Sequence, residues 1–362
     1  MLARVVLCDK NGCAHGAFIR EQKGLNCMKK RINLKGRSLL KISDLSDDEL
    51  IYLLDLADRL KRKKKRGVRG NLLARKNIAL IFEKASTRTR SAFTVAAVDE
   101  GGSVEFMSRH DIHLGKKESI KDTARVLGRM FDAIQFRGFK QETAEILARY
   151  SGVPVWNGLT DDAHPTQALA DLMTIHEHFH RLKGLKVVYV GDGRNNVCLS
   201  LMVGCAKAGA NFVDCTPPKL APSPACLDGV QTVARRNACT VTVESDPAKA
   251  VAGAHVIYTD VWVSMGEESK FDERLRLLKP YQVNMDLIRK TGNVGRNGVI
   301  FLHCLPAFHN NATELTRTLG ALEVTDEVFE APFSKVFDQA ENRMHTIKAL
   351  MLATLTGGDG QR

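Results

Sequence analysis

The chain has 362 residues, a formal net charge of +12 and 44% hydrophobic residues, a composition typical of a soluble globular protein large enough for two domains. Its nine cysteines are an odd number without a Cys-x-x-Cys pair, which argues against a disulfide framework. A reducing compartment, by default the cytoplasm, is therefore expected. No apolar run is long enough to cross a bilayer, and the positive charge fits anionic partners, either nucleic acid or small acidic substrates.

Residues 1–32 are expected to form a disordered extension, because this segment shows little hydrophobic periodicity. Its apolar run Val5-Val6-Leu7 is too short for a signal peptide. A mitochondrial transit peptide is an alternative that the acidic Asp9 and Glu21 disfavour.

A first helix is predicted from Ser43 to Lys65, where Ser46 and Glu49 have the spacing of a capping box ahead of an apolar stripe. The helix ends in the basic run 61–66. Because the run contains no aromatic residues and no nucleic-acid-recognition motif accompanies it, we interpret it as a solvated helix end and not as a nucleic-acid site.

The following segments alternate between strand-like and helical patterns, which predicts an α/β fold with two doubly wound parallel-sheet domains. The strand-like runs are Ile78–Phe82, Val104–Met107, Ala133–Phe136, Val153–Trp156, Lys186–Val190, Phe212–Cys215, Val256–Thr259 and Val299–Leu302. The predicted domains span residues 33–165 and 166–337, and a helix from about Thr166 to His180 links them. A last helix, Gln339 to Leu355 within residues 338–362, is expected to pack back onto the first domain.

The segment Ser86-Thr87-Arg88-Thr89-Arg90 lies between a predicted strand and a predicted helix. Hydroxyls, guanidinium groups and the free N–H groups of a first helical turn are suited to binding a phosphate dianion. The pattern alone fits an N-cap with exposed arginines equally well. Both interpretations remain open at this point.

Four further motifs follow in a fixed order: His164-Pro165-Thr166-Gln167, Asp260-Val261-Trp262-Val263-Ser264-Met265-Gly266, His303-Cys304-Leu305-Pro306 and Glu341-Asn342-Arg343-Met344-His345. Together with the first segment they resemble the ornithine carbamoyltransferases of the aspartate/ornithine carbamoyltransferase family. The resemblance covers about Asn33 to Thr354. It implies transfer of the carbamoyl group of carbamoyl phosphate to the side-chain amine of L-ornithine, giving L-citrulline and phosphate, with no metal or organic cofactor.

The resemblance also assigns the site residues and the domains. It places carbamoyl phosphate in the first domain, on Ser86, Thr87, Arg88, Thr89, Arg90, His113, Arg137, His164, Pro165, Thr166, Gln167, Cys304, Leu305 and Arg343. It places ornithine in the second domain, on Asn196, Asp260, Ser264 and Met265. It assigns catalysis to Arg88, Arg137, His164, Asp260 and Cys304. It further implies a homotrimer, or a multiple of one, in which the loop carrying His113 reaches the neighbouring subunit's site, with no nucleic-acid or membrane partner.

Residue chemistry supports parts of this assignment. A carbamoyl transferase must neutralise a phosphate leaving group, polarise a carbonyl and accept attack by a neutral amine. The amine of ornithine should titrate near that of lysine, at about 10, so the site needs a group that favours its neutral form. Asp260 and Cys304 are the candidates. Arg137 taken alone fits an ordinary strand-end arginine, whereas His164 precedes a proline and is therefore expected at a loop edge.

Two positions limit the assignment. The resemblance assigns Asn196 as an ornithine ligand, but a shift of one residue in the match would assign Asn195. His113 stands where many bacterial relatives carry glutamine, so its role is less secure than that of Arg88.

Other functions compete with this one. His176-Glu177-His178-Phe179-His180 matches H-E-x-x-H, the helix-borne motif of zinc metallopeptidases, with His176 and His180 as ligands. It lacks an evident third ligand and ends a helix, so we interpret it as a solvated helix end. Val190-Gly191-Asp192-Gly193 lacks the third glycine of a dinucleotide-binding loop. Putrescine, another amine or aspartate could replace ornithine as acceptor, although Ser264-Met265-Gly266 favours ornithine.

Overall fold

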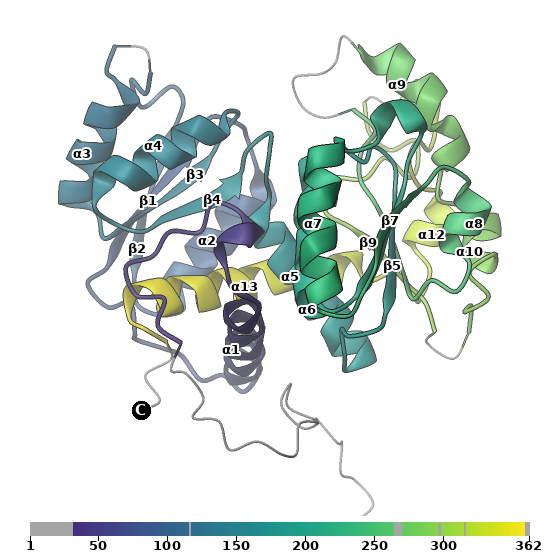
Figure 1. Ribbon diagram of the computed structural model, residues 1–362. Coiled ribbons are helices and arrows are strands. Elements are labelled where there is room, and N and C mark those ends of the chain that lie inside the picture. Colours follow the sequence, from purple (N-terminus) through teal and green to yellow (C-terminus); the bar gives the residue numbers. More distant parts are fainter. Residues whose placement is uncertain (1–31, 116, 264–269, 296–297, 315, 359–362) are drawn as a thin grey trace, which may run out of the picture.

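The computed structural model describes residues 32–358 except 116, 264–269, 296–297 and 315. Two parallel sheets lie side by side (Figure 1), with strand orders β2-β1-β3-β4 and β7-β6-β5-β8-β9. The strands are β1 Asn77–Phe82, β2 Ser103–Ser108, β3 Ala133–Arg137, β4 Val155–Leu159, β5 Lys186–Val190, β6 Asn211–Cys215, β7 Val241–Glu244, β8 Val256–Thr259 and β9 Ile300–His303. In the first sheet, β2 and β3 lie on opposite sides of β1. In the second sheet, β6 and β8 lie on opposite sides of β5. The direction of the strand order therefore reverses beside β1 and beside β5, and each reversal forms a switch point.

Helices cover the sheets and also fill the space between them. The helices are α1 Asp47–Lys65, α2 Thr87–Val98, α3 Ile120–Met130, α4 Gln141–Ser151, α5 Pro165–Phe179, α6 Asn196–Ala208, α7 Pro224–Arg236, α8 Pro247–Val251, α9 Phe271–Leu278, α10 Met285–Arg289, α11 Thr316–Leu319, α12 Asp326–Phe329 and α13 Val336–Leu355. Short 3-10 turns lie at η1 Ile42–Asp44, η2 Pro218–Leu220 and η4 Lys279–Tyr281. Among the described helices, none combines the length and apolar character needed to cross a bilayer.

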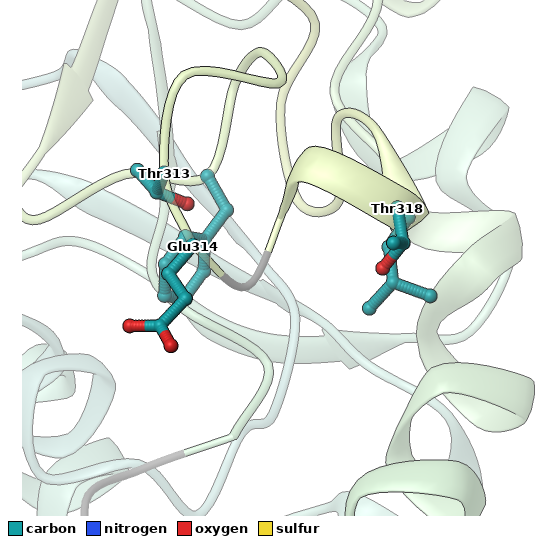
Figure 2. Close-up of a pocket in the computed structure, with 5 residues that line it drawn as sticks. Thr313, Glu314 and Thr318 are labelled. Atoms are coloured by element: carbon teal, nitrogen blue, oxygen red, sulfur yellow. The ribbon is translucent and has the colours of Figure 1, made fainter.

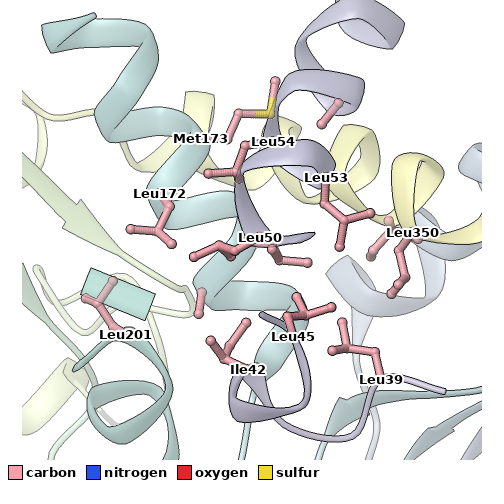
Figure 3. Packing of buried hydrophobic residues seen from close by; sticks show 14 of the residues in the cluster. Leu39, Ile42, Leu45, Leu50, Leu53, Leu54, Leu172, Met173, Leu201 and Leu350 are labelled. Carbon is pink, nitrogen blue, oxygen red and sulfur yellow. The ribbon is translucent and has the colours of Figure 1, made fainter. Parts of the chain in front are cut away.

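One apolar core joins the two sheets. Alternate residues of β1 and β5, such as Ile78 and Val187, contribute to the same buried cluster, whereas their neighbours face separate cores on the outer sides. Helices α1, α5 and α13 form the middle of this cluster, and α13 packs against α1, α2 and α5. Figure 3 shows Leu50 of α1 close to Leu172 of α5. The predicted fold class, with its linking helix and a C-terminal helix that packs back, is confirmed.

The predicted elements agree with the observed ones, with small differences at their ends. Ser46 and Glu49 form the expected capping box of α1. Strand β4 begins at Val155 and not at Val153, because Pro154 has no N–H to donate to a neighbouring strand. The short edge strand β7 was not predicted. The domain boundaries at residues 165 and 337 stay predictions, and residues 1–31 of the predicted extension lie outside the described residues.

The prediction of a solvated basic run is wrong at Lys61. Lys61 is only 5% exposed, because α1 packs against α5 and α13. Its Nζ forms an ion pair with Glu177 at 2.8 Å and donates a hydrogen bond to Asn342 at 2.7 Å. Lys61 thus joins α1, α5 and α13, and it occupies the carboxylate that a zinc peptidase would need as its general base.

The glycine-rich turn after β5 contacts a buried carboxyl group. Asp214, in β6, is fully buried, and its Oδ1 accepts a weak hydrogen bond from Cys198 Sγ at 3.7 Å. A Cβ atom at Gly193 would lie 2.1 Å from Asp214 Oδ2, so this position needs glycine for close packing. Gly193 is therefore explained without a bound dinucleotide. Burial raises the pKa of Asp214 to about 8.

Asp214 makes stability depend on pH. Folding takes up a proton between the carboxyl's ordinary pKa of 3.8 and its folded pKa of about 8, so the free energy of unfolding falls as pH rises through this window. We expect the melting temperature of Asp214→Asn, relative to wild type, to rise by roughly 2–8 °C between pH 5 and pH 9. The exposed Asp228→Asn serves as control. Parallel pH curves for wild type and Asp214→Asn would contradict this account.

Candidate active site

Two buried arginines and one half-buried arginine meet at the carboxyl end of the first sheet. Arg88 lies in the first turn of α2, Arg137 is the last residue of β3, and Arg343 comes from α13. Arg137 and Arg343 both donate to the Thr89 hydroxyl, at 3.2 and 3.0 Å, and Arg343 also donates to Thr166 at 3.4 Å. Thr89 and Thr166 thus hold the guanidinium groups side by side, at a switch point where ligands of such sheets bind.

The three positive charges repel one another. Burial, followed by the charges of Arg343 and Arg88, lowers the pKa of Arg137 to about 9. Burial followed by Arg88 lowers the pKa of Arg343 to about 10. The Nε atoms of Arg137 and Arg343 have no hydrogen-bond partner among the described residues. A buried cluster with unused donors is suited to a multivalent anion such as phosphate.

The rest of the first segment surrounds this cluster. Ser86 caps α2, where its Oγ accepts the Thr89 N–H at 3.1 Å, and Thr87 begins the helix with an exposed side chain. The first N–H groups of a helix have no partner within the helix, so they are available to an anion. Arg90 is exposed and its guanidinium lies 3.7 Å from the centre of the Phe106 ring. Arg90 therefore links the first turn of α2 to β2.

His164 and Gln167 reach the site from the start of α5, where Pro165 is the first helical residue. His164 is buried, and burial followed by Arg343, Arg137 and Arg88 lowers its pKa well below 6.5. The ring is therefore neutral, and it can still donate one N–H. His164 Nδ1 and Gln167 Oε1 are buried without a partner among the described residues. Both atoms are free to bind a substrate group.

The second sheet contributes Asp260 and Cys304, which follow β8 and β9. Cys304 Sγ donates to Asp260 Oδ1 at 3.0 Å, and Asn195 Nδ2 donates to Asp260 Oδ2 at 3.0 Å. Burial, and then Asp260, raise the pKa of Cys304 well above 9.0, so the thiol stays protonated. Burial lowers the pKa of Arg88, while Cys304 and Asp260 oppose this shift. Arg88 is therefore close enough to interact electrostatically with Asp260 and Cys304.

The two candidate asparagines make different contacts. Asn195 caps α6 by accepting the Val197 N–H at 2.7 Å and also binds Asp260. Asn196 Nδ2 donates to the Thr160 carbonyl at 2.5 Å and so links α6 to the segment after β4. Both side chains are half-buried. The choice of Asn196 as substrate ligand stays a prediction.

The remaining predicted residues lie in three different situations. Leu305 adjoins the site with a positive φ of 59°, and its N–H donates to His303 Nδ1 at 2.9 Å. His113 is exposed on its loop and does not join the arginine cluster within this chain. Ser264 and Met265 lie outside the described residues. The roles assigned to His113, Ser264 and Met265 stay predictions.

Comparison with known proteins agrees with this arrangement. The model described as aspartate/ornithine carbamoyltransferase, carbamoyl-P binding domain matches residues 37–177, and that described as Asp/Orn binding domain matches residues 183–354. The chain belongs to this family. It is 59% identical over 334 residues to a catabolic ornithine carbamoyltransferase of Bacillus licheniformis, a match that covers 91% of this chain and 99% of that protein. A catabolic ornithine carbamoyltransferase of Staphylococcus aureus is 56% identical over 334 residues, covering 91% and 98%.

Solved structures of the family agree as well. Ornithine carbamoyltransferase of Pyrococcus furiosus is 43% identical, covers 90% of this chain and 99% of its own, and superposes with a TM-score of 0.83. The enzyme of Gloeobacter violaceus is 41% identical with a TM-score of 0.75, covering 90% and 100%. The resemblance noted in the sequence is therefore confirmed.

The metallopeptidase alternative receives no support. Two groups of described residues bring potential metal-ligand atoms within 4.8 Å of one another, Asp260–His303–Cys304 and His309–Asp326–Glu330, and neither contains His176 or His180. Among the described residues, the H-E-x-x-H sequence is therefore not part of either group that could hold a metal ion.

A hollow of about 620 Å³ has none of the three arginines in its lining (Figure 2). Its lining residues are Phe308, Thr313, Glu314, Thr318 and Leu319. Because its one charged residue is a glutamate, this hollow is unsuited to a phosphate. None of these residues belongs to the predicted site.

Sequence reasoning missed the residues behind the site. Asp171 accepts a hydrogen bond from Gln167 at 2.7 Å, and the fully buried pair His303–Glu323 lies 3.2 Å apart behind Leu305. Asp171 stands four residues after Gln167 in one helix, a spacing that could have indicated contact. Glu323 carries no such local signal.

We expect inorganic phosphate to stabilise the protein, because an anion would relieve the repulsion among the buried arginines. At 100 times its Kd, phosphate should add about 2.7 kcal/mol to the free energy of unfolding. A thermal-shift titration measures this, with sodium chloride at equal ionic strength as control. Arg88→Ala should lose most of the gain, while the exposed Arg129→Ala should keep it. Equal stabilisation of all three proteins would mean that phosphate binds elsewhere.

Proposed function

We propose that this chain is a carbamoyltransferase that converts carbamoyl phosphate and L-ornithine into L-citrulline and phosphate. This proposal rests above all on the cluster of Arg88, Arg137 and Arg343, in which half-buried Arg88 interacts electrostatically with Asp260 and Cys304. An anion site and an amine site are thereby adjacent. The names of the curated relatives and the two matching family models support the same conclusion.

The leaving phosphate would be bound by the first segment. Ser86, Thr87, Thr89 and Arg90 surround the N-terminus of α2, whose N–H groups favour an anion. Arg88 lies in this first turn and interacts electrostatically with Cys304 and Asp260, so we propose that it stabilises negative charge as the charge moves from the carbonyl oxygen to the phosphate. Stabilising a charge that grows in the transition state accelerates the reaction more than binding the substrate does.

The carbonyl would be polarised by donors that are already in place. Arg137 supplies positive charge, and His164 supplies a neutral ring that can donate a hydrogen bond to an oxyanion. Arg343 adds charge from α13. The NH₂ group of carbamoyl phosphate needs acceptors, and Gln167 Oε1 and the Leu305 carbonyl are the candidates.

The amine would attack from the side of the second sheet. Asp260 can accept a hydrogen bond from the side-chain amine of ornithine, and the protonated Cys304 keeps Asp260 oriented. A carbon–nitrogen bond forms as the bond between the carbonyl carbon and the phosphate oxygen breaks. The proton released by the amine nitrogen passes to the departing phosphate, which leaves as hydrogen phosphate. Asn196, Ser264 and Met265 are proposed to hold the amino-acid end.

The finer assignments extend this proposal. We place the protein in the cytoplasm and infer a homotrimer or a multiple of one, in which His113 completes a neighbouring subunit's site. The exposure of His113 in the single chain supports this. Sedimentation of a monomer with full activity would contradict it.

The reaction test is citrulline formation from carbamoyl phosphate, with ornithine, putrescine and aspartate compared as acceptors. We expect ornithine to be preferred. We expect Arg88→Ala to lower kcat about 10²–10³-fold, because one donor to the developing charge is lost.

Arg129→Ala, on the exposed face of α3, is the control and should retain wild-type activity. A preference for putrescine would show that putrescine and not ornithine is the acceptor, without contradicting the proposed anion site. No product with any acceptor would refute the proposed function.

A further inference from the structure

Asp171 is fully buried in α5 and lies behind the site. Its Oδ1 accepts hydrogen bonds from Gln167 Nε2 at 2.7 Å and from Gln339 Nε2 at 2.6 Å, and the Tyr258 hydroxyl lies at 3.5 Å. Its Oδ2 has no hydrogen-bond partner among the described residues. Gln339 belongs to α13 and Tyr258 to β8, so one carboxyl oxygen collects donors from three elements.

A backbone group fixes the direction of this network. The His303 N–H donates to Gln339 Oε1 at 3.0 Å, and a backbone N–H can only donate. The Gln339 amide must therefore present its NH₂ group to Asp171. Asp171 Oδ1 therefore acts as a hydrogen-bond acceptor. It can pair only with the NH₂ group of Gln167, and not with its carbonyl oxygen.

The orientation of the Gln167 amide then decides which of its polar groups faces the ligand. With its NH₂ group engaged by Asp171, its carbonyl oxygen Oε1 is left buried and without a partner. An unpaired buried acceptor costs free energy until a donor arrives. A rotated amide would present NH₂ to the ligand and meet the NH₂ of a carbamoyl group with donor against donor.

We propose that Asp171 is a positioning residue that holds the Gln167 amide with its oxygen toward the NH₂ group of carbamoyl phosphate. This inference rests on the proposed function. Through Gln167, Asp171 distinguishes a carbamoyl group from an acyl group of the same shape that lacks the NH₂ donor. The chain of contacts runs from the His303 backbone through Gln339 and Asp171 to Gln167.

This role does not depend on the charge of Asp171. Burial raises the pKa of Asp171 to about 7, while hydrogen bonds from Gln167 and Gln339 and the charge of Arg343 oppose the rise. A proton on the unpartnered Oδ2 leaves Oδ1 free to accept. Asparagine, which keeps an oxygen acceptor for Gln339, should therefore preserve the orientation, whereas alanine should abolish it.

The test compares carbamoyl phosphate with acetyl phosphate, which carries a methyl group in place of the NH₂. The KM for carbamoyl phosphate and the competitive inhibition constant of acetyl phosphate are measured in the citrulline assay. Asp171→Ala should raise the KM roughly 10- to 100-fold, because a buried hydrogen bond is lost, and leave the inhibition constant of acetyl phosphate unchanged. Asp171→Asn should restore the wild-type ratio of the two constants.

Controls separate positioning from general damage. Thr174→Val removes a buried hydroxyl from the same helix that bonds Asn342 and not Gln167, so it should leave the ratio unchanged. Asp171→Ala should have no further effect on the ratio in a Gln167→Met background. If Asp171→Ala does not fold, the larger Asp171→Leu replaces it with the same expectation.

The outcomes are distinct. Equal weakening of carbamoyl phosphate and acetyl phosphate by Asp171→Ala, in the presence of an active wild type, would overturn the positioning role alone. An inactive wild type would overturn the proposed function and this inference with it. A carbamoyl-specific loss that Asp171→Asn restores confirms the role.

Discussion

Burial of the Arg137 and Arg343 guanidinium groups side by side, next to half-buried Arg88, is the constraint on which the site depends. Charged groups are costly to remove from water, and like charges add to this cost. The pKa values of Arg137 and Arg343, lowered to about 9 and about 10, show both effects. A site of this kind gains most from an anion, because the ligand supplies the missing counter-charge. Affinity for a phosphate group and the strain of the empty site therefore have the same cause.

The apolar core between the sheets makes this arrangement tolerable. Arg343 reaches Thr89 across 254 residues of sequence, and it does so because α13 packs against α1, α2 and α5. The same core places the carboxyl ends of both sheets next to each other, so that Arg88 faces Asp260 and Cys304. Burial of apolar side chains thus offsets the free-energy cost of burying the charged groups of the site.

Much of the fold could be predicted from local patterns, because buried parallel strands and capped helices carry their signals within a few residues. The capping box of α1 and the positions of β1, β5 and β8 are examples. The exposed edge strand β7 carried too weak an apolar pattern. The burial of Lys61 depends on Glu177 and Asn342, which are distant in sequence, and no local pattern reveals it.

The residues of the site likewise fall into those that local sequence patterns indicate and those that they do not. Arg88 and His164 were indicated by strand ends and by their motifs, and the resemblance to a family supplied the roles. The residues that hold them, Asp171, Gln339 and Glu323, act through contacts between elements and were not predicted. The substrate roles of Asn196, Ser264 and Met265 stay predictions. Motifs mark groups that touch a ligand, whereas the groups that orient them become visible only in three dimensions.

The most direct test of the central claim is the free energy of unfolding of Arg137→Met, measured by denaturant titration with and without saturating phosphate. Methionine fills the buried volume without charge. Without phosphate the variant should be more stable than wild type, because a buried repulsive charge is gone, and with phosphate it should be less stable than wild type. A variant that is destabilised equally under both conditions would show that the arginines do not repel one another in the empty site, and it would contradict the account.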